Sequence, residues 1–272
     1  MPQQTLILIR GAGDLASGVA ARLHRSRYAV AMTEVAQPLM VRRAVCFGEA
    51  VYDEEAWIEG IGARRTTSVL EAHAIIRDGM IPVLVDPGAQ CRAELAPAAI
   101  VDGIMAKRNT GTTIHDAPLV VALGPGYTAG ADCHCVIETL RGHWLGRPIW
   151  EGSAAPDTGE PGEIAGQGIA RLLRSPADGV FEAQVEIGDR VEAGQILATI
   201  GDVPLRAQID GVVRGLMRSG LRVWRGVKVG DVDPRAERTH CFTLSDKSLA
   251  IGGGVLEALL SRSILPLSEP TG

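Results

Sequence analysis

The stretch Leu6-Ile7-Leu8-Ile9-Arg10-Gly11-Ala12-Gly13-Asp14-Leu15-Ala16 decides the fold of the first half of the chain. Four consecutive apolar residues predict a buried strand that ends at Arg10. Two glycines follow, and the helical pattern Ala16–His24 begins directly after them. The next predicted strand, Ala29–Thr33, is followed by an acid, Glu34. This order of strand, glycine turn, helix, strand and acid is the dinucleotide-binding fingerprint in its required context.

The glycine turn predicts a binding site for a phosphate-bearing ligand. Gly11 and Gly13 let the backbone approach a phosphate, and the helix amides face it. Glu34 is expected to bind a ribose hydroxyl, and Arg10 to offset the charge of Asp14, which would repel an anion in the same loop. The alternative is a tight turn between strand and helix that holds no ligand.

Further apolar runs continue the pattern of a parallel sheet. Besides the strands above, the predicted strands are Ile81–Val85, Ala99–Val101 and Leu119–Ala122. Ser68 and Glu71 form a capping box that opens a helix at Val69–Arg77. A third helix is expected at Asp132–Leu140. Together these elements indicate a Rossmann-like parallel sheet domain over residues 1–165, and the Gly- and Pro-rich run Gly152–Gly168 is expected to be a linker.

An internal repeat follows the linker. Asp178-Gly179-Val180 recurs as Asp210-Gly211-Val212, and Gly188, Arg190, Val191 and Gly194 recur as Gly220, Arg222, Val223 and Gly226. Two such halves, each unable to cover its own apolar face, predict an all-β barrel-sandwich hybrid over residues 174–236, the fold of biotinyl and lipoyl carrier domains. The hairpin between the halves, Gly201–Arg206, contains no lysine, so we expect a docking module rather than a carrier. Residues 237–272 are expected to pack back on the first domain, with Ile251–Leu260 as a glycine turn that feeds a helix.

A second group of candidate ligand-binding residues lies in loops. The run Gly124–Gly130, with Gly124, Gly126 and Thr128, also connects a predicted strand to a predicted helix, and such a loop can direct several amides at one anion. Basic clusters occur at Arg42-Arg43 and at Lys107-Arg108-Asn109, and Asp102 ends an apolar strand. These side chains suit phosphate or carboxylate contacts, although solvated surface positions are the alternative for the basic clusters.

Cys133 and Cys135 are the candidate reactive residues. If they begin a helix, its dipole would lower the pKa of their thiols and favour the thiolate. Two residues apart on a helix they point in different directions, so we expect no metal site there. His134 and Glu138 are four apart and are expected on one helix face, as a ligand-orienting pair or as a surface ion pair.

Composition limits the classes of partner. The 272 residues carry a net charge of −5, so no overall positive field draws the chain to nucleic acid or to an anionic membrane. No apolar run approaches the length of a membrane helix, and the first apolar run is too short for a signal peptide. Five scattered cysteines suit free thiols better than a disulfide framework. We therefore expect a cytoplasmic protein, and leave a homo-oligomer open.

The run of motifs resembles the YqeB-type accessory proteins encoded with selenium-dependent molybdenum hydroxylases, which are distantly similar to the XdhC maturation factors. The motifs that carry the resemblance are Ile9–Gly18, Glu34 with Pro38 and Arg42-Arg43, Ala106–Asn109, Leu123–Gly130, Ile137–His143, Gly230–Arg235, Ser245–Lys247 and Ala250–Glu257. The family pattern usually has Asp-Ala-Arg where this chain has Asp102-Gly103-Ile104, so no arginine contact is expected from position 104.

The resemblance implies a role in finishing or inserting the cofactor of a selenium-dependent molybdenum hydroxylase. The implied ligand is molybdenum cofactor, as molybdopterin or its dinucleotide form, and the implied partners are the apo-hydroxylase and a chalcogen donor protein. Through this chemistry Cys133 or Cys135 would relay sulfur or selenium. Whether the protein is an enzyme stays open. The alternatives from other classes are an NAD(P)-dependent oxidoreductase and a nucleotide-sensing binding module.

Overall fold

The structure is a computed structural model, and it describes residues 5–157, 159 and 166–266. The chain forms two compact units, each assembled from separate stretches of sequence. The first unit contains Met1–Pro38, Phe47–Asp157 and Leu244–Gly272, and the second contains Leu39–Cys46 and Thr158–Thr243. The predicted linker Gly152–Gly168 includes positions 158 and 160–165, which lie outside the described residues. No helix in the described part of the chain is both long and apolar enough to cross a membrane.

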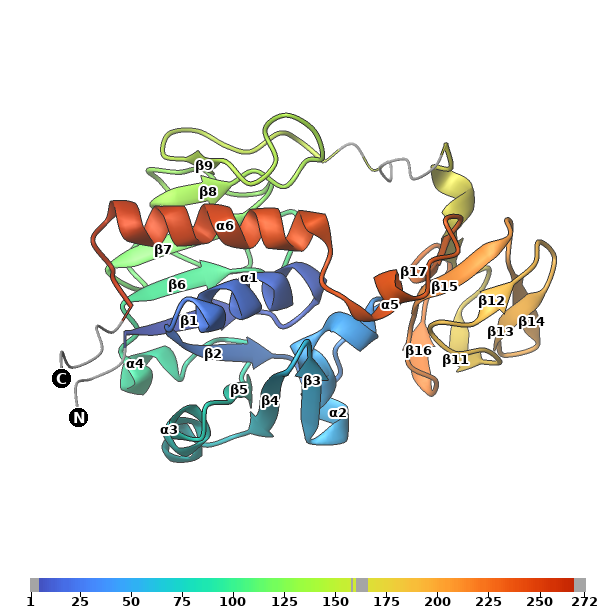
Figure 1. Ribbon diagram of the computed structural model, residues 1–272, viewed down its shortest axis with the longest axis horizontal. Helices are drawn as coiled ribbons and strands as arrows, with labels where there is room; N and C mark the ends of the chain where they lie inside the picture. Colours follow the sequence, from blue (N-terminus) through green and yellow to red (C-terminus); the bar gives the residue numbers. More distant parts are fainter. Residues whose placement is uncertain (1–4, 158, 160–165, 267–272) are drawn as a thin grey trace. The chain divides into compact units, whose positions relative to one another are not determined.

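A nine-stranded sheet forms the centre of the first unit (Figure 1). Its order is β3 (Glu55–Ile58), β4 (Ile61–Thr66), β5 (Ile81–Val85), β2 (Ala29–Glu34), β1 (Leu6–Arg10), β6 (Ala99–Asp102), β7 (Leu119–Leu123), β8 (Cys135–Ile137) and β9 (Pro148–Ile149). In this order, the seven strands from β4 through β8 are all parallel to one another, and only β3 and β9 are antiparallel. Central strands covered on both faces read as continuous apolar runs, which is why β1, β2, β5, β6 and β7 lie where the sequence predicts them.

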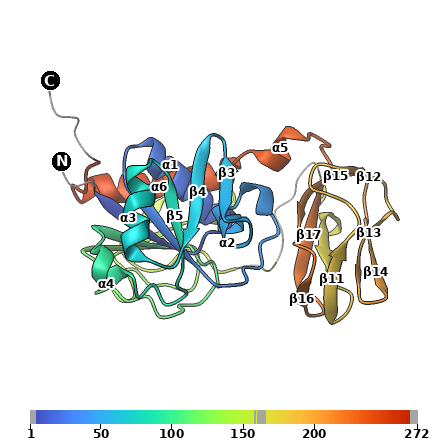
Figure 2. The same cartoon turned by 90° about the horizontal axis from the view of Figure 1, so that it is seen from below.

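Helices cover both faces of this sheet. Helix α1 (Asp14–Arg25) and helix α6 (Asp246–Ser261) lie side by side over one face (Figures 1 and 2). Helix α3 (Val69–Arg77) packs on the other face, in a cluster with Leu6 and Leu8 of β1. The short helices α2 (Ala50–Asp53) and α4 (Arg92–Leu95) complete the unit. The predicted N-cap is confirmed, because the Ser68 side chain accepts a hydrogen bond from the Glu71 amide at 3.4 Å. The reciprocal bond of the predicted capping box is not made, because the Ser68 amide donates to the Thr66 hydroxyl, which donates to Glu71 Oε2.

Small residues allow α1 and α6 to approach closely. A Cβ atom at Gly18 would lie 2.4 Å from Ser248 Cβ, and one at Gly252 would lie 3.0 Å from Arg22 Cβ. Because the earlier residue of α1 meets the earlier residue of α6, the two helices run in the same direction. Both therefore begin at the carboxyl-terminal edge of the parallel strands, since α1 follows β1 directly.

The second unit contains two antiparallel sheets of four strands. One has the order β10 (Leu172–Arg174), β17 (Lys228–Asp233), β15 (Gly211–Leu216) and β12 (Arg190–Val191). The other has the order β14 (Val203–Arg206), β13 (Ile196–Ile200), β11 (Gly179–Ala183) and β16 (Leu221–Val223). The short elements η1 (Arg43–Val45), η3 (Ile169–Arg171) and α5 (Thr239–Phe242) belong to this unit.

The 32-residue repeat corresponds to pairs of strands. Strands β11 and β15 begin at positions 179 and 211, and strands β13 and β17 begin at positions 196 and 228. The halves exchange partners, because β12 of the first pairs with β15 of the second, and β16 of the second pairs with β11 of the first. Each sheet therefore contains strands from both halves.

The predicted fold class, a Rossmann-like parallel sheet domain plus a barrel-sandwich hybrid domain, is wrong. The structure contains one mixed sheet and two antiparallel sheets. The large sheet is mixed because a tight hairpin through Glu59 and Gly60, both with positive φ, folds β3 back on β4, and β9 returns antiparallel to β8. β3 contains the exposed Glu55 and Trp57, and β9 is only two residues long, so both lack the apolar runs that identify the central strands.

Two predicted local elements are also wrong. The helix expected at Asp132–Leu140 is absent from these described residues, and Cys135–Ile137 forms the buried strand β8 instead. The glycines expected to form a turn at Ile251–Leu260 lie inside α6, which begins at Asp246. Glycine is required at Gly252 and Gly254, because a Cβ atom at either position would lie too close to neighbouring atoms.

Candidate anion-binding site at the carboxyl ends of the central strands

The candidate site lies where the strand order reverses. After β1 the chain continues to β2, which lies on one side of β1, and it later returns to β6, which lies on the other side. In open α/β sheets the crevice beyond the carboxyl ends of the strands at such a point is the usual place for a ligand. The glycine turn, the loop after β6 and the loop after β7 all start at this edge.

The two glycines of the first turn have different surroundings. Gly11 has a φ of +88°, and a Cβ atom there would lie 3.1 Å from the backbone of Ile104, so the loop after β6 packs against it. Gly13 is the N-cap of α1 with a φ of −74°, and no atom lies within 4 Å of the position a Cβ would take. The open side of the turn is therefore at Gly13, beside the first amides of α1, which have no carbonyl partner within the helix. Asp14 is the first residue of that helix.

Glu34 stabilises the glycine turn through its carboxylate. Its Oε1 accepts the Ala12 amide at 3.0 Å and its Oε2 accepts the Val35 amide at 2.6 Å. Burial raises the pKa of Glu34, while the two amide hydrogen bonds act in the opposite direction. Both oxygens are thus engaged with the backbone, which disfavours the ribose-binding role predicted from its position.

A buried polar network joins β1, β6 and the loop that follows β6. Arg10 Nη1 donates to Asp102 Oδ2 at 3.2 Å and to the Thr112 hydroxyl, which in turn donates to Asp102 Oδ2. Asp102 is fully buried, and its Oδ1 accepts the Ile104 amide at 3.2 Å. Tyr127 is also buried, and burial together with the charge of Asp102 raises its pKa. Arg10 and Asp102 therefore organise the loop from inside and do not face solvent.

The second glycine loop packs against the protein. A Cβ at Gly124 would lie 2.5 Å from Thr139 Oγ1, and one at Gly126 would lie 2.5 Å from the Arg108 amide nitrogen. The Thr128 amide donates to Asp132 Oδ2 at 2.8 Å. These glycines are required by close approach of neighbouring chain, which favours the interpretation of a structural turn over that of an anion site.

Lys107 and Asn109 lie in the loop after β6. Lys107 is exposed, and its Nζ contacts Asp157 Oδ2 at 2.5 Å. Asn109 Oδ1 accepts the Gly111 and Thr112 amides at 2.8 and 2.9 Å, so it shapes this loop. Of this pair, only Lys107 offers charge at the surface.

Glu138 and His134 are not a pair on one helix face, because the helix is absent. Glu138 is buried and accepts three amides, those of Thr139 and Leu140 at 2.7 Å and that of Ala155 at 2.8 Å. His134 Nδ1 accepts the Val120 amide at 3.0 Å, and burial lowers the pKa of His134. Glu138 therefore organises the turn after β8, and His134 holds β7.

The lowered pKa predicted for the two cysteine thiols is wrong. Cys133 and Cys135 are completely buried, Cys135 in β8 and Cys133 two residues before it, and neither is at the start of a helix. Burial raises the pKa of Cys133 to about 12 and that of Cys135 to about 11. Thiols in this state are poor nucleophiles, so the relay of a chalcogen through them has no support in the structure.

Arg42 and Arg43 belong to the second unit. Arg42 Nη2 donates to the carbonyl oxygens of His240 and Thr243, and Arg43 Nε donates to that of Leu216 at 3.1 Å. The glycine turn, in contrast, belongs to the first unit.

Lys247 is a site residue that was not predicted from the sequence. It lies in the first turn of α6, and its charge interacts with Arg141, Asp14 and Glu138. Burial lowers the pKa of Lys247. Arg141 is bound to Asp246 at 2.7 Å. The sequence signal for its position is the Ser245-Asp246-Lys247 motif, in which Ser245 is the N-cap of α6. No group of three or more potential metal ligands occurs in the described part of the chain.

The fold and this site define an α/β protein with a glycine turn at the strand-order reversal and an additional antiparallel β unit. Comparison with models of known families finds no match. The chain is 50% identical over 255 residues to an uncharacterized YqeB protein of Escherichia coli, a match that covers 94% of this chain. The chain belongs to the YqeB-type family. It spans about half the length of that relative, 47%.

Solved structures give weaker similarities. A succinylglutamate desuccinylase/aspartoacylase from Rhodobacter sphaeroides is 27% identical over 30% of each chain, with a TM-score of 0.21. An aspartoacylase family protein from Mesorhizobium loti is 16% identical over 84% of each chain, with a TM-score of 0.25. A succinylglutamate desuccinylase from Silicibacter is 13% identical over 85% of each chain, also with a TM-score of 0.25.

Proposed function

We propose that the protein is an accessory factor in the maturation of a selenium-dependent molybdenum hydroxylase, and that it binds molybdenum cofactor through the phosphate of molybdopterin or of its dinucleotide form. The family relation and the motifs along the chain support this role. The recipient is the apo-hydroxylase. Because Cys133 and Cys135 are buried with raised pKa values, the chalcogen comes from a separate donor rather than through this chain.

The observation that carries the proposal is the open space at Gly13. Nothing lies within 4 Å of a Cβ built there, although the neighbouring Gly11 is tightly packed. The first amides of α1 point out of the helix at this position, and the helix dipole places partial positive charge on them. A phosphate oxygen at Gly13 would accept hydrogen bonds from these amides without displacing protein atoms.

The charges near this opening favour one anion but limit its size. Lys247 interacts with Asp14 through space, so its ammonium group offsets the one acid in the first turn of α1. Helix α6 begins beside α1 and points the same way, which adds a second positive helix end. A terminal phosphate fits this arrangement better than an extended polyanion, because Asp14 and Asp246 would repel additional negative charges.

NAD(P) is disfavoured by the state of Glu34. In a dinucleotide site the acid after the second strand binds the ribose hydroxyls. Here both Glu34 oxygens accept backbone amides, at 3.0 and 2.6 Å. A ribose would have to compete with hydrogen bonds that hold the glycine turn itself.

The test compares Gly13→Asp with Gly13→Asn in protein purified from a molybdenum-replete host. The φ of −74° suits both residues, and both are good N-caps, so each variant should fold as well as the wild type. They differ only in the negative charge placed where the phosphate would lie. Bound molybdenum is measured by elemental mass spectrometry, and the pterin by fluorescence after oxidation.

We expect the wild type to carry molybdenum and pterin, Gly13→Asn to carry less of both because its side chain competes for the same amides, and Gly13→Asp to carry neither because it adds a negative charge. Retention of the pterin by Gly13→Asp would remove this turn from the site. A wild-type protein that carries NAD(P) and no molybdenum would replace the proposed cargo with a dinucleotide.

A further inference from the structure

Apolar side chains that reach solvent follow the carboxyl-terminal edge of the large sheet, starting beside the glycine turn. Ile104 and Met105 lie in the loop after β6, where Ile104 is 37% exposed and Met105 is half-buried. Leu140 and Trp144 lie in the loop between β8 and β9 and are 45% and 60% exposed. We call these four residues the apolar strip. Apolar side chains exposed as a group mark an interaction site far more often than single ones do.

Close contacts connect the apolar strip to the glycine turn. The backbone of Ile104 lies 3.1 Å from the position that a Cβ would take at Gly11. A Cβ at Gly124 would lie 3.3 Å from Met105 Cε and 2.5 Å from Thr139 Oγ1, so the loops after β6, β7 and β8 meet at this glycine. Because the apolar strip continues at the residue after Thr139, it extends from the glycine turn along the ends of neighbouring strands.

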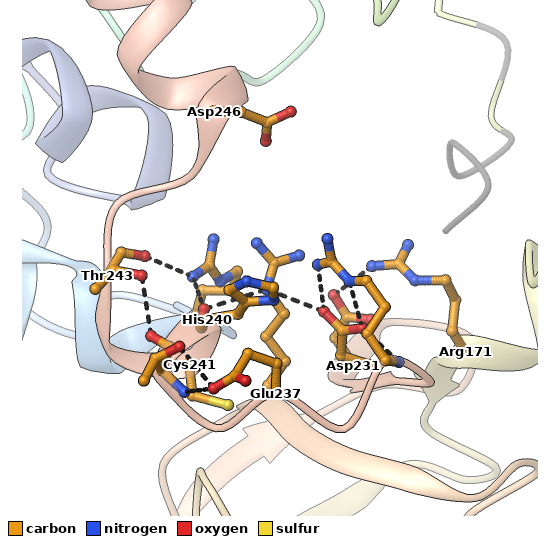
Figure 3. Close-up of polar contacts among 12 residues, drawn as sticks. Arg171, Asp231, Glu237, His240, Cys241, Thr243 and Asp246 are labelled. Atoms are coloured by element: carbon orange, nitrogen blue, oxygen red, sulfur yellow. Dashed lines mark hydrogen bonds and ion pairs between the residues drawn. The ribbon is translucent and has the colours of Figure 1, made fainter. Parts of the chain in front are cut away.

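The loop between β8 and β9 is held in place at its start. Glu138 Oε1 accepts the amides of Thr139 and Leu140, each at 2.7 Å. Arg141 binds both carboxylate oxygens of Asp246, at 2.7 and 3.0 Å, and Figure 3 shows Asp246 at the start of α6. The loop therefore presents its exposed side chains from a fixed backbone, next to the helix start that lies beside the glycine turn.

The indole ring of Trp144 is supported on one side and open on the other. The Arg147 guanidinium lies over the ring, 4.3 Å from its centroid, and the His143 ring is perpendicular to it, with centroids 5.0 Å apart. Arg147 Nη2 and His143 Nε2 are only 3.4 Å apart, so both groups lie toward the same face of the indole. The opposite face is open to solvent, because Trp144 is 60% exposed. An indole oriented in this way is a platform on which a flat heterocycle can stack.

We propose that Trp144 stacks on the pterin ring of the ligand whose phosphate lies at Gly13, and that the rest of the apolar strip contacts the ligand between these two ends. The stacking role rests on the proposed function, because the phosphate fixes one end of the ligand at the glycine turn. The acids Asp14 and Asp246 disfavour a second phosphate, so the ring is that of molybdopterin rather than the base of its dinucleotide form. A pterin ring is uncharged at neutral pH and is not repelled by these acids.

The test is a calorimetric titration of the full chain, made in a host without molybdopterin synthesis, with guanosine monophosphate and with ribose 5-phosphate. Guanosine monophosphate joins a phosphate to a fused ring that shares the aminopyrimidinone part of pterin, and ribose 5-phosphate lacks the ring. The principal variant is Trp144→Ala, and Trp144→Phe retains an aromatic face. The matched control is Trp57→Ala, because Trp57 is 62% exposed and lies on β3 at the opposite edge of the sheet. Circular dichroism verifies that each protein is folded.

We expect the wild type and Trp57→Ala to bind guanosine monophosphate about tenfold more tightly than ribose 5-phosphate, which is the size of a stacking contribution. Trp144→Ala should lose most of this preference and keep its affinity for ribose 5-phosphate, and Trp144→Phe should retain part of the preference. Gly13→Asp should weaken the binding of both probes, because it acts on the phosphate. In a molybdenum-replete host, Trp144→Ala should also retain less pterin than Trp57→Ala.

The outcomes separate the stacking role from the phosphate site. If Trp144→Ala keeps the wild-type preference while Gly13→Asp loses both probes, the stacking role is overturned and the phosphate site stands. A wild type that binds neither probe overturns both. If Trp144→Ala keeps a full complement of pterin but no longer supports activation of the hydroxylase, the apolar strip contacts the protein partner and the stacking role is overturned.

Discussion

Adjacent glycines in α6 provide a direct test of how this helix is packed. Gly253 and Gly254 lie in the middle of the helix, but their surroundings differ. A Cβ at Gly254 would lie 2.0 Å from the Gly146 carbonyl oxygen and 3.1 Å from Ile137 Cγ2, whereas nothing lies within 4 Å of one at Gly253. The substitutions Gly253→Ala and Gly254→Ala each add one methyl group and change the helix propensity by the same amount. They differ only in the surroundings of the added methyl group.

The expected free energies have opposite signs. Alanine is favoured over glycine inside a helix by roughly 0.5–1 kcal/mol, so Gly253→Ala should stabilise the first unit by that amount. Gly254→Ala gains the same term but forces a methyl group into a backbone oxygen that cannot rotate away. Overpacking of this kind costs about 1–3 kcal/mol, which makes the substitution destabilising on balance. In a chain of this size the two variants should differ in Tm by roughly 3–10 °C.

Thermal unfolding followed by the helical circular-dichroism signal measures this difference. The helices α1, α3 and α6 all belong to the first unit, so the signal reports mainly on it. Gly253→Ala is the internal control for helix propensity. Equal shifts of Tm in the two variants would refute the close contact between α6 and the turn at Gly146.

Three further predictions concern single side chains in the first unit. Ser68→Ala removes the N-cap of α3 and should cost about 1 kcal/mol of unfolding free energy in denaturant titrations, whereas Ser68→Asp should retain it. Cys133 and Cys135 are buried, with pKa values raised to about 12 and about 11. Both thiols should therefore react with an aromatic disulfide reagent only after the protein is unfolded. Rapid labelling of either thiol in the native protein would contradict their placement. Burial raises the pKa of Glu34, so this carboxyl group stabilises the fold fully below its ordinary pKa, and the stabilisation is lost as pH rises through the raised pKa. Glu34→Gln should remove this loss. If the variant and the wild type showed the same dependence of stability on pH from about pH 4 upward, the shift would be contradicted.

Much of the central sheet could be predicted from the sequence, because its strands are buried on both faces. β1, β2, β5, β6 and β7 are apolar throughout, and such runs need no neighbour to be recognised. The hairpin β3–β4 at one end of the sheet was missed for the converse reason. β3 and β4 contain exposed glutamate and half-exposed arginine residues that form ion pairs across the hairpin, such as Arg64 with Glu55. Their pairing depends on a turn, not on an apolar pattern.

The errors at β8 and α6 have one physical origin. Glycine in a sequence usually indicates a turn, but in α6 Gly252 and Gly254 are required by contacts with α1 and with the Gly146 turn. Cys135–Ile137 is only three residues long, too short to show a period of two or of 3.6. Both features depend on distant parts of the chain, which a local pattern does not contain.

The site was predicted in part. The glycine turn and the burial of Asp102 at the end of β6 follow from local order, but the engagement of Glu34 with Ala12 and Val35 depends on how the turn approaches β2. Lys247 was missed because its position near Asp14 requires two helices separated by more than 200 residues to start side by side. Arg42 and Arg43 were predicted as candidate ligand-binding residues from their charge, whereas in the structure they belong to the second unit and donate to backbone carbonyls.

The division of the first unit into three stretches determines the order in which the protein can be completed during synthesis. All residues of the second unit precede Leu244 in the chain, whereas α6 of the first unit follows it. A ribosome therefore releases every strand of both units before it releases the helix that covers α1 and one face of the large sheet. Until then the small residues of α1 and the apolar surface next to β7 and β8 have no cover. During this interval the nascent first unit is exposed to aggregation and to chaperones, while the second unit is already able to close.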